Sequence, residues 1–178
     1  MGLITNLLEK NYASYLHEYL ETHKIKRSSV TWDESKSIGI LFDGLNVAAN
    51  PEILDFIKKS KKQGLNVKAL AIVNKKLDTS SLIFDTISSK DISWSQVPKL
   101  DALNNFHTTP FDILFNFYNS GIKPLEFISM ISNAKMRIGF QGTNIDCSDL
   151  LVGNAQHSSF IDLVESSKKI LRHMAVGA

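Results

Sequence analysis

The sequence predicts an α/β fold: a mostly parallel, Rossmann-like sheet of five or six strands, flanked by helices, with an extra amphipathic helix at the amino terminus. Two segments lead to this prediction, because each has the pattern strand, helix, strand. One spans residues 38–73 and the other spans residues 111–140. Two strands joined through a single short helix are typical of the parallel crossover that builds an α/β sheet.

The amino-terminal helix is expected over residues 3 to about 23, where apolar side chains recur at helical spacing. Tyr12, Tyr15 and Tyr19 lie in this stripe. Two interpretations remain open. The helix covers its own domain, which is the commoner role of an amphipathic helix, or it is a docking helix whose tyrosines contact a protein partner.

Length and composition indicate one globular domain. The 178 residues are 43% hydrophobic and 21% charged, which argues against disorder. We expect residues 1–27 to form the helix and a basic connector, and residues 28–178 to form a single α/β domain. The single cysteine and the absence of a long apolar run predict a cytoplasmic protein that does not cross a membrane.

The first strand–helix–strand unit has clear local signals. Residues 38–42 are apolar throughout, as in a buried central strand. Asn50-Pro51-Glu52 places a cap, a proline and an acid in the order that opens a helix, and Gly64 is a suitable residue to end it. Residues 67–73 then form the second strand.

The region between the two units is less regular. Weaker signals in this region predict a short helix at residues 80–87, a strand at 92–94 and a helical turn at 100–106.

The second unit begins with a strand at residues 112–118 and continues through a helix opened by Pro124. It returns as a strand at residues 136–140. An edge strand at 149–153 and a last helix capped at 158–159 complete the prediction.

Polar residues at the strand ends are the candidate ligand-binding residues, because parallel α/β sheets bind ligands beyond the carboxyl ends of their strands. Asp43 could orient a hydroxyl group or a metal-bound water, although Asp-Gly is also the usual sequence of a tight turn. Asn46 could donate to a phosphate or a carbonyl. The remaining candidates are Asn74, Asn116 and Asn119.

Familiar catalytic and cofactor motifs are not found in the sequence. It has no G-x-G-x-x-G fingerprint, no Walker loop, no histidine or cysteine spacing typical of zinc, and no G-x-S-x-G elbow. We therefore expect no metal and no cofactor, and the sequence assigns no catalytic residue.

A lysine-rich helix face is a second candidate for partner binding. It includes Lys58 and Lys62 within the run of residues 58–62. A solvated helix face is the usual explanation of such a run, and the net charge of +2 is too small to indicate nucleic acid by itself. Binding to a ribosome or RNA through these lysines stays an alternative.

The run at residues 111–116, followed by residues 127–140, resembles a segment of the amino-terminal half of bacterial heptosyltransferases. The most specific part of the match is Ala134-Lys-Met-Arg-Ile-Gly-Phe140. The resemblance implies a related Rossmann-like fold. Those enzymes pair two such domains and usually have an acidic residue where this chain has Asn116, so a glycosyltransferase activity is not implied. The chain also resembles an uncharacterised single-domain bacterial family.

These observations favour a non-catalytic cytoplasmic binding or adaptor protein whose partner is a protein or protein complex. One alternative is an enzyme that binds a small molecule or nucleotide sugar, related to half of a glycosyltransferase. A further alternative is a factor associated with the ribosome or RNA.

Overall fold

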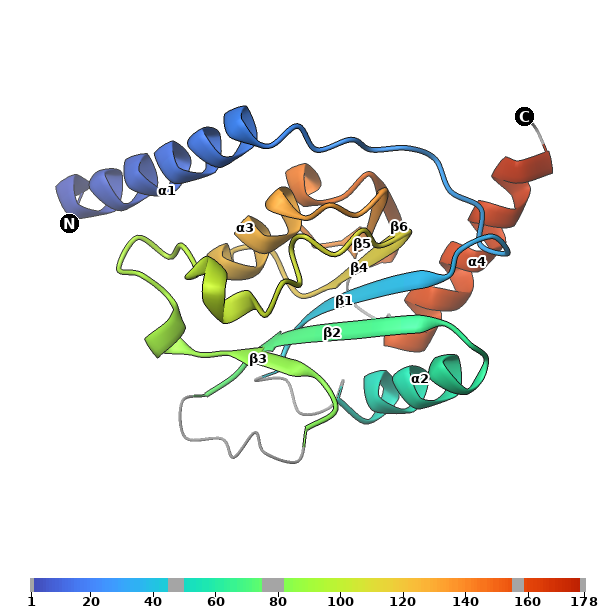
Figure 1. Ribbon diagram of the computed structural model, residues 1–178. Helices are drawn as coiled ribbons and strands as arrows, with labels where there is room; N and C mark the ends of the chain where they lie inside the picture. The colour runs from blue at the N-terminus through green and yellow to red at the C-terminus, as the bar shows by residue number, and fades with distance from the viewer. Residues whose placement is uncertain (1, 45–49, 75–81, 155–158, 177–178) are drawn as a thin grey trace.

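The computed structural model describes residues 2–44, 50–74, 82–154 and 159–176 (Figure 1). Within these residues a six-stranded sheet has the order β3-β2-β1-β4-β5-β6, and every neighbouring pair is parallel. The strands are β1 (Ser37–Asp43), β2 (Asn66–Ile72), β3 (Asp85–Ile87), β4 (Ile113–Phe117), β5 (Met136–Gln141) and β6 (Leu150–Asn154). The α-helices are α1 (Gly2–Thr22), α2 (Asn50–Lys62), α3 (Lys123–Ile131) and α4 (Phe160–Val176). The predicted α/β class is confirmed.

The two central strands, β1 and β4, are buried on both faces, which explains their continuous apolar sequences. Their register places Ile40 beside Phe115, and both side chains are fully buried. β6 lies at one edge of the sheet, as the sequence predicts.

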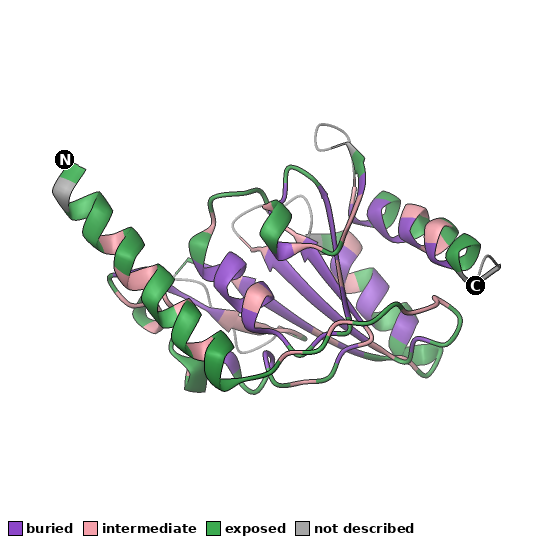
Figure 2. Cartoon of the chain, turned by 90° about the horizontal axis from the view of Figure 1, so that it is seen from above, coloured by how far each residue is buried: buried purple, intermediate pink, exposed green. Residues whose placement is uncertain are grey.

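Helices cover both faces of the sheet (Figures 1 and 2). On one face α2 and α4 pack against the sheet, with Phe56 and Phe160 in edge-to-face contact at 5.3 Å between ring centroids. On the other face Leu41 and Leu114 pack with α3 and with the irregular segment of residues 88–111. α1 lies outside α3.

The helix-boundary signals act as predicted. α2 begins at Asn50, and Gly64 follows its end with φ +84°, a left-handed conformation that glycine adopts without strain. Pro124 is the second residue of α3. Before α4, the Ser159 hydroxyl accepts a hydrogen bond of 3.2 Å from the Asp162 backbone N–H.

Two local predictions are wrong. Residues 85–87 form strand β3, whereas the sequence predicted a helix through residue 87, of which residues 80–81 lie outside the described part. Residues 92–94 do not form a strand, since they contribute only an isolated bridge between Ile92 and Pro98. β3 has three residues, too few for a period-two pattern, and is defined by its pairing with β2.

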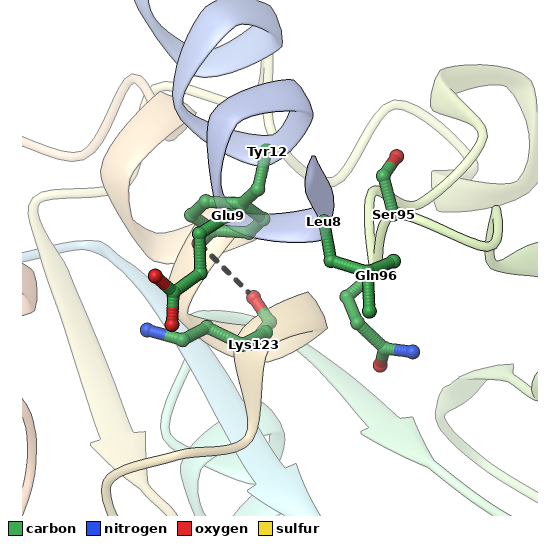
Figure 3. Close-up of a pocket in the computed structure, with 6 residues that line it drawn as sticks. All are labelled: Leu8, Glu9, Tyr12, Ser95, Gln96 and Lys123. Carbon is green, nitrogen blue, oxygen red and sulfur yellow. Dashed lines mark hydrogen bonds between the residues drawn. The ribbon is translucent and has the colours of Figure 1, made fainter. Parts of the chain in front are cut away.

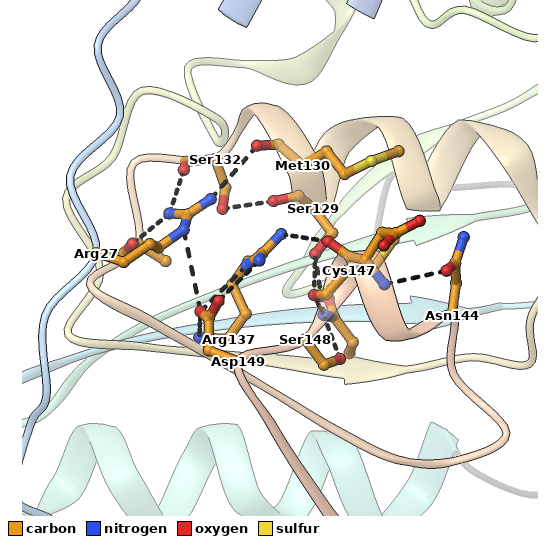
Figure 4. A network of polar contacts seen from close by, with 12 residues as sticks. Arg27, Ser129, Met130, Ser132, Arg137, Asn144, Cys147, Ser148 and Asp149 are labelled. Carbon is orange, nitrogen blue, oxygen red and sulfur yellow. Dashed lines mark hydrogen bonds and ion pairs between the residues drawn. The ribbon is translucent and has the colours of Figure 1, made fainter. Parts of the chain in front are cut away.

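The connector after α1 is fastened to the domain by Arg27 (Figure 4). Its guanidinium donates to the backbone carbonyls of Ser132, Ala134 and Met130, which follow or end α3. It also lies 3.9 Å from the carboxylate of Asp149. Burial, and then the nearby Arg137, lower the pKa of Arg27 to about 10, so it stays charged at neutral pH.

Candidate functional site

The carboxyl ends of all the strands meet at one edge of the sheet, because the strands are parallel. Asp43, Asn74 and Asn119 lie at this edge, at or just after the ends of β1, β2 and β4. Asn74 and Asn119 are exposed and Asp43 is partly buried. Asn46 lies outside the described residues.

Asn116 occupies a different environment from the other candidates. It is fully buried in β4, and its Nδ2 donates to Ser129 Oγ at 2.9 Å and to the Cys147 carbonyl at 2.6 Å. These bonds join the sheet to α3 and to the 3-10 turn at Ile145–Cys147. Its Oδ1 has no hydrogen-bond partner in the part of the chain that the structure describes. The structure therefore places Asn116 in the core rather than at the strand-end surface.

The protein's own carboxylates occupy the amino-terminal ends of two helices at this edge. Glu126, 1% exposed, accepts hydrogen bonds from the Gly121 backbone N–H at 2.8 Å and from Lys123 Nζ at 2.9 Å, beside the start of α3. Burial raises the pKa of Glu126, but these donors together outweigh it, and the net pKa is lowered. At the start of α4, Glu52 accepts a hydrogen bond of 2.9 Å from the backbone N–H of Phe160. Helix amino termini attract anions. Glu52 fills this position at α4, whereas the carboxylate of Glu126 lies beside the start of α3 without capping an N–H of that helix.

A pocket of about 220 Å³ lies between α1, the start of α3 and the turn at residues 93–97 (Figure 3). It is lined by Leu8, Glu9, Tyr12, Ser95, Gln96 and Lys123. The Tyr12 hydroxyl donates to the Lys123 carbonyl at 3.2 Å, and its ring meets Phe127 edge to face at 5.8 Å. Burial, and then Glu126, raise the pKa of Tyr12, so the hydroxyl keeps its proton at neutral pH.

The three candidate tyrosines of α1 divide into two groups. Tyr12 and Tyr19 pack against the domain, where Tyr19 meets His107 edge to face at 6.1 Å. Tyr15 points outward and is 55% exposed. Ile4 and Leu7, in the first two turns, are 70% and 53% exposed. One side of α1 therefore covers the domain while another side, rich in apolar residues, meets solvent.

Trp94 is a second large apolar side chain in solvent, and sequence reasoning did not single it out. It is 61% exposed, on the turn that faces α1 across the pocket. Hydrogen bonds from Ser93 N to the Val97 carbonyl at 2.9 Å and from Val97 N to Ser93 Oγ at 3.1 Å hold this turn. The signal in the sequence that could have identified Trp94 as a surface residue is its position between two serines, because such a local sequence is too polar for a core strand.

The candidate lysines lie on α2, which packs on the sheet face opposite to α1. Lys58 and Lys62 are both exposed. The neighbouring Lys59 forms an ion pair of 2.7 Å with Asp55. These lysines and the pocket beside α1 therefore lie on opposite sides of the sheet.

The described residues contain neither a metal-binding cluster nor a membrane-spanning helix. No group of three or more histidine, cysteine, aspartate or glutamate side chains in that part of the chain could hold a metal ion. No helix there is long and apolar enough to cross a membrane.

Comparison with known proteins identifies a family. The model of a family described as "Family of unknown function (DUF6913)" matches residues 9–174. The chain belongs to this family. Among curated proteins, a search finds no match. The resemblance of residues 111–140 to heptosyltransferases stays a prediction. The family match covers most of α1 and all of the sheet. Of the residues that line the pocket beside α1, only Leu8 precedes the matched range, whereas the exposed Ile4 and Leu7 both precede it.

Proposed function

We propose that this protein is a non-catalytic binding or adaptor protein that docks a protein partner on the surface formed by the first turns of α1 and the turn carrying Trp94. This docking surface comprises Ile4, Leu7, Leu8, Trp94 and the pocket that Leu8 lines. The observation that carries the proposal is that α1 packs against the domain on one side and exposes apolar residues to solvent on another. Tyr12 and Tyr19 fasten the helix to the domain, while Ile4 and Leu7 extend into solvent.

Exposed apolar side chains that gather on one surface mark interaction sites, whereas scattered ones do not. Trp94 sits on a hydrogen-bonded turn, so little conformational entropy is lost when a partner covers it. Tryptophan is also the side chain that most often dominates the energy of an interface. A pocket beside such an anchor suits one apolar side chain of the partner.

The charge of α1 favours a protein over an anionic lipid surface. Glu9, Glu18 and Glu21 outnumber Lys10 among its charged residues. An anionic membrane would repel this helix, whereas interfacial membrane helices are rich in lysine and arginine. We expect a partner segment that combines an apolar anchor with basic residues around it.

The occupied helix ends weaken the nucleotide-sugar alternative. Glu126 and Glu52 place carboxylates where α3 and α4 would attract a phosphate group. Glycosyltransferase activity and RNA binding through Lys58 and Lys62 stay alternatives without a supporting contact in the described residues.

The test compares full-length variants in affinity capture from the native cytosol. Leu7→Asp and Trp94→Ala change the docking surface, while Ile161→Asp, 37% exposed on α4, is the matched control on the opposite face. We expect the wild type and the control to retain the same partner, and both surface variants to lose it with unchanged melting temperatures. With purified partner, Trp94→Ala should weaken binding by about 2 kcal/mol, which is roughly 30-fold.

Two results would count against the proposal. One is a partner that the surface variants retain as well as the wild type. The other is binding of the wild type to anionic vesicles that is lost in Leu7→Asp, which would assign the surface to a membrane.

A further inference from the structure

The exposed apolar residues of α1 belong to a longer stripe on the helix surface. At 100° per residue, five side chains fall within an arc of about 100°. They are Ile4, Leu7, Leu8, Asn11 and Tyr15, and together they form the α1 stripe. Ile4, Leu7 and Tyr15 are exposed, whereas Leu8 and Asn11 are partly buried. The stripe extends the docking surface along the helix as far as Tyr15, over about 16 Å.

The α1 stripe lies on the side of the helix that borders the turn at residues 93–97. Figure 3 shows Leu8 pointing toward Gln96 of that turn, whereas Glu9 extends toward the side of the pocket where Lys123 lies. Exposed residues follow α1 along its length (Figure 2). Because Leu8 belongs to the stripe, the stripe and the turn that carries Trp94 border the same side of α1. One element of a partner can therefore contact both.

The charged residues of α1 oppose the dipole of their own helix. Glu18 and Glu21 lie near its carboxyl end, and its last turn carries no basic residue. A carboxylate there is unfavourable, because that end of a helix has a partial negative charge. Neither carboxylate forms an ion pair within the described part of the chain. Glu18 follows Asn11 by seven residues, so it lies in line with the α1 stripe. These acids therefore do not stabilise α1 itself.

The charge decides between two occupants of the stripe. A second copy of the chain would bring α1 against α1, with Glu9, Glu18 and Glu21 of both copies and only Lys10 to balance them in each. Like charges repel, so this pairing is unfavourable. A basic partner would instead pair with these carboxylates. The spacing of the stripe is that of a helix that packs lengthwise on another helix, whereas an added strand requires the free backbone groups of a sheet edge.

We propose that the α1 stripe and Trp94 bind an amphipathic α-helix of the partner, which places its apolar face on the stripe and lysine or arginine beside Glu18. This inference rests on the proposed docking function and specifies the secondary structure and the charge of the partner. Tyr15 adds an aromatic contact two turns beyond Leu8. Asn11, in the middle of the stripe, supplies a polar side chain that favours one register of the two helices.

Three synthetic peptides of about 18 residues, long enough to form a helix, test this proposal on the full chain. The first has leucine at helical spacing, lysine on both sides of the leucine face and alanine elsewhere. The second has the same composition in an order without helical spacing, and the third has glutamate in place of lysine. In fluorescence anisotropy the first peptide should bind saturably and about tenfold more tightly than either of the others. Its affinity should fall as salt is added, because salt screens ion pairs.

Two variants locate the bound peptide. Tyr15→Asp and Glu18→Lys should each weaken binding of the first peptide about tenfold and leave the melting temperature unchanged, since both side chains are exposed. Glu18→Lys should also reduce the salt dependence of binding. Leu20→Asp is the matched apolar control, at a leucine of α1 that is 40% exposed and lies outside the stripe. Glu165→Lys, at an exposed carboxylate of α4, is the matched charge control. Both controls should bind the peptide as the wild type does.

Spectra of ¹⁵N-labelled wild-type protein give a readout that needs no variant. The side-chain amide signal of Asn11 and the indole N–H signal of Trp94 should shift as the first peptide is added, and backbone signals of α2 should not. The proposal is overturned if these signals do not move, or if the second or third peptide binds as tightly as the first. It is also overturned if the wild type is a dimer that Tyr15→Asp makes monomeric, because the stripe would then bind a second copy.

Failure of this inference can be told apart from failure of the docking proposal. A native partner that Leu7→Asp loses and Tyr15→Asp retains would overturn the helix inference alone. A native partner that both Leu7→Asp and Trp94→Ala retain would overturn the docking proposal, whatever the peptides do.

Discussion

The carboxylate of Glu52, in the first turn of α2, accepts a 2.9 Å hydrogen bond from the backbone N–H of Phe160, where α4 begins. The two residues are 108 positions apart in the sequence. The contact therefore ties the starts of the two helices that cover one face of the sheet, and it places a negative charge at the positive end of α4.

Removing this carboxylate should lower the stability of the fold. Glu52→Ala is expected to cost about 1 kcal/mol, the usual value of a helix cap, because the N–H of Phe160 loses its partner. Urea unfolding followed by circular dichroism measures the difference. Asp55→Ala is the control on the same helix, since its ion pair with Lys59 is exposed and contributes only about 0.3–0.5 kcal/mol. Equal losses in the two variants would contradict the capping role.

The core of the sheet gives a larger expected effect. Ile138, in β5, is fully buried, and Ile138→Ala should cost roughly 2–5 kcal/mol because it leaves a cavity in a packed interior. Ile145→Ala, at a side chain 72% exposed, should change stability by less than about 0.5 kcal/mol. A loss below ~1 kcal/mol for Ile138→Ala in urea melts would show that Ile138 is not packed in the core of the sheet.

The sequence predicts the elements whose signals are local. β1 and β4 are continuous apolar runs because both of their faces are buried, and α2 carries its own cap and stop residues. β3 was missed because its three residues, Asp85 to Ile87, become a strand only by pairing with β2. Strand pairing between distant segments leaves no local pattern in so short a strand.

The candidate site was predicted less completely, for a related reason. The rule that residues just after parallel strands lie at the carboxyl edge of the sheet predicts the positions of Asn74 and Asn119. It could not find Gln96, because the turn that brings this residue to the pocket beside α1 belongs to the irregular segment between the two units. Likewise the contact of Glu126 with the Gly121 backbone depends on how α3 enters after β4.

The pH dependence of stability should include a contribution from His107. Burial, and then the nearby His23, lower the pKa of His107, and its buried Nδ1 has no hydrogen-bond partner among the described residues. The unfolded chain therefore binds a proton more readily than the folded one, and stability should fall as the pH drops below about 6.5. Urea melts at pH 7.5 and pH 5.5 should show this loss, and His107→Phe should show a smaller one. An equal pH dependence in the variant would assign the effect to other groups.

The single thiol should report unfolding. Cys147 is fully buried, and burial, followed by the charge of Glu126, raises its pKa to about 12. A thiol reagent such as 5,5′-dithiobis(2-nitrobenzoate) needs the thiolate, so native protein at pH 8 should react far more slowly than protein in concentrated urea. Rapid stoichiometric labelling without denaturant would mean that the turn at Ile145–Cys147 opens readily in the native state.

The arrangement of α1 can be tested with two tyrosines of the same helix. Tyr12 packs on Phe127 and donates to the Lys123 carbonyl, whereas Tyr15 is 55% exposed. Tyr12→Ala should therefore cost roughly 1.5–3 kcal/mol from lost apolar burial, and Tyr15→Ala should stay within about 0.5 kcal/mol of the wild type in urea melts.

Tyr12→Phe separates the hydroxyl from the ring in the same experiment. It removes only the bond to Lys123 and should cost about 0.5–1.5 kcal/mol. If Tyr15→Ala were the more destabilising of the two alanine variants, α1 would have to be rotated about its axis. The first turns would then present a different face to solvent, and Ile4 and Leu7 would no longer form a docking surface with Trp94.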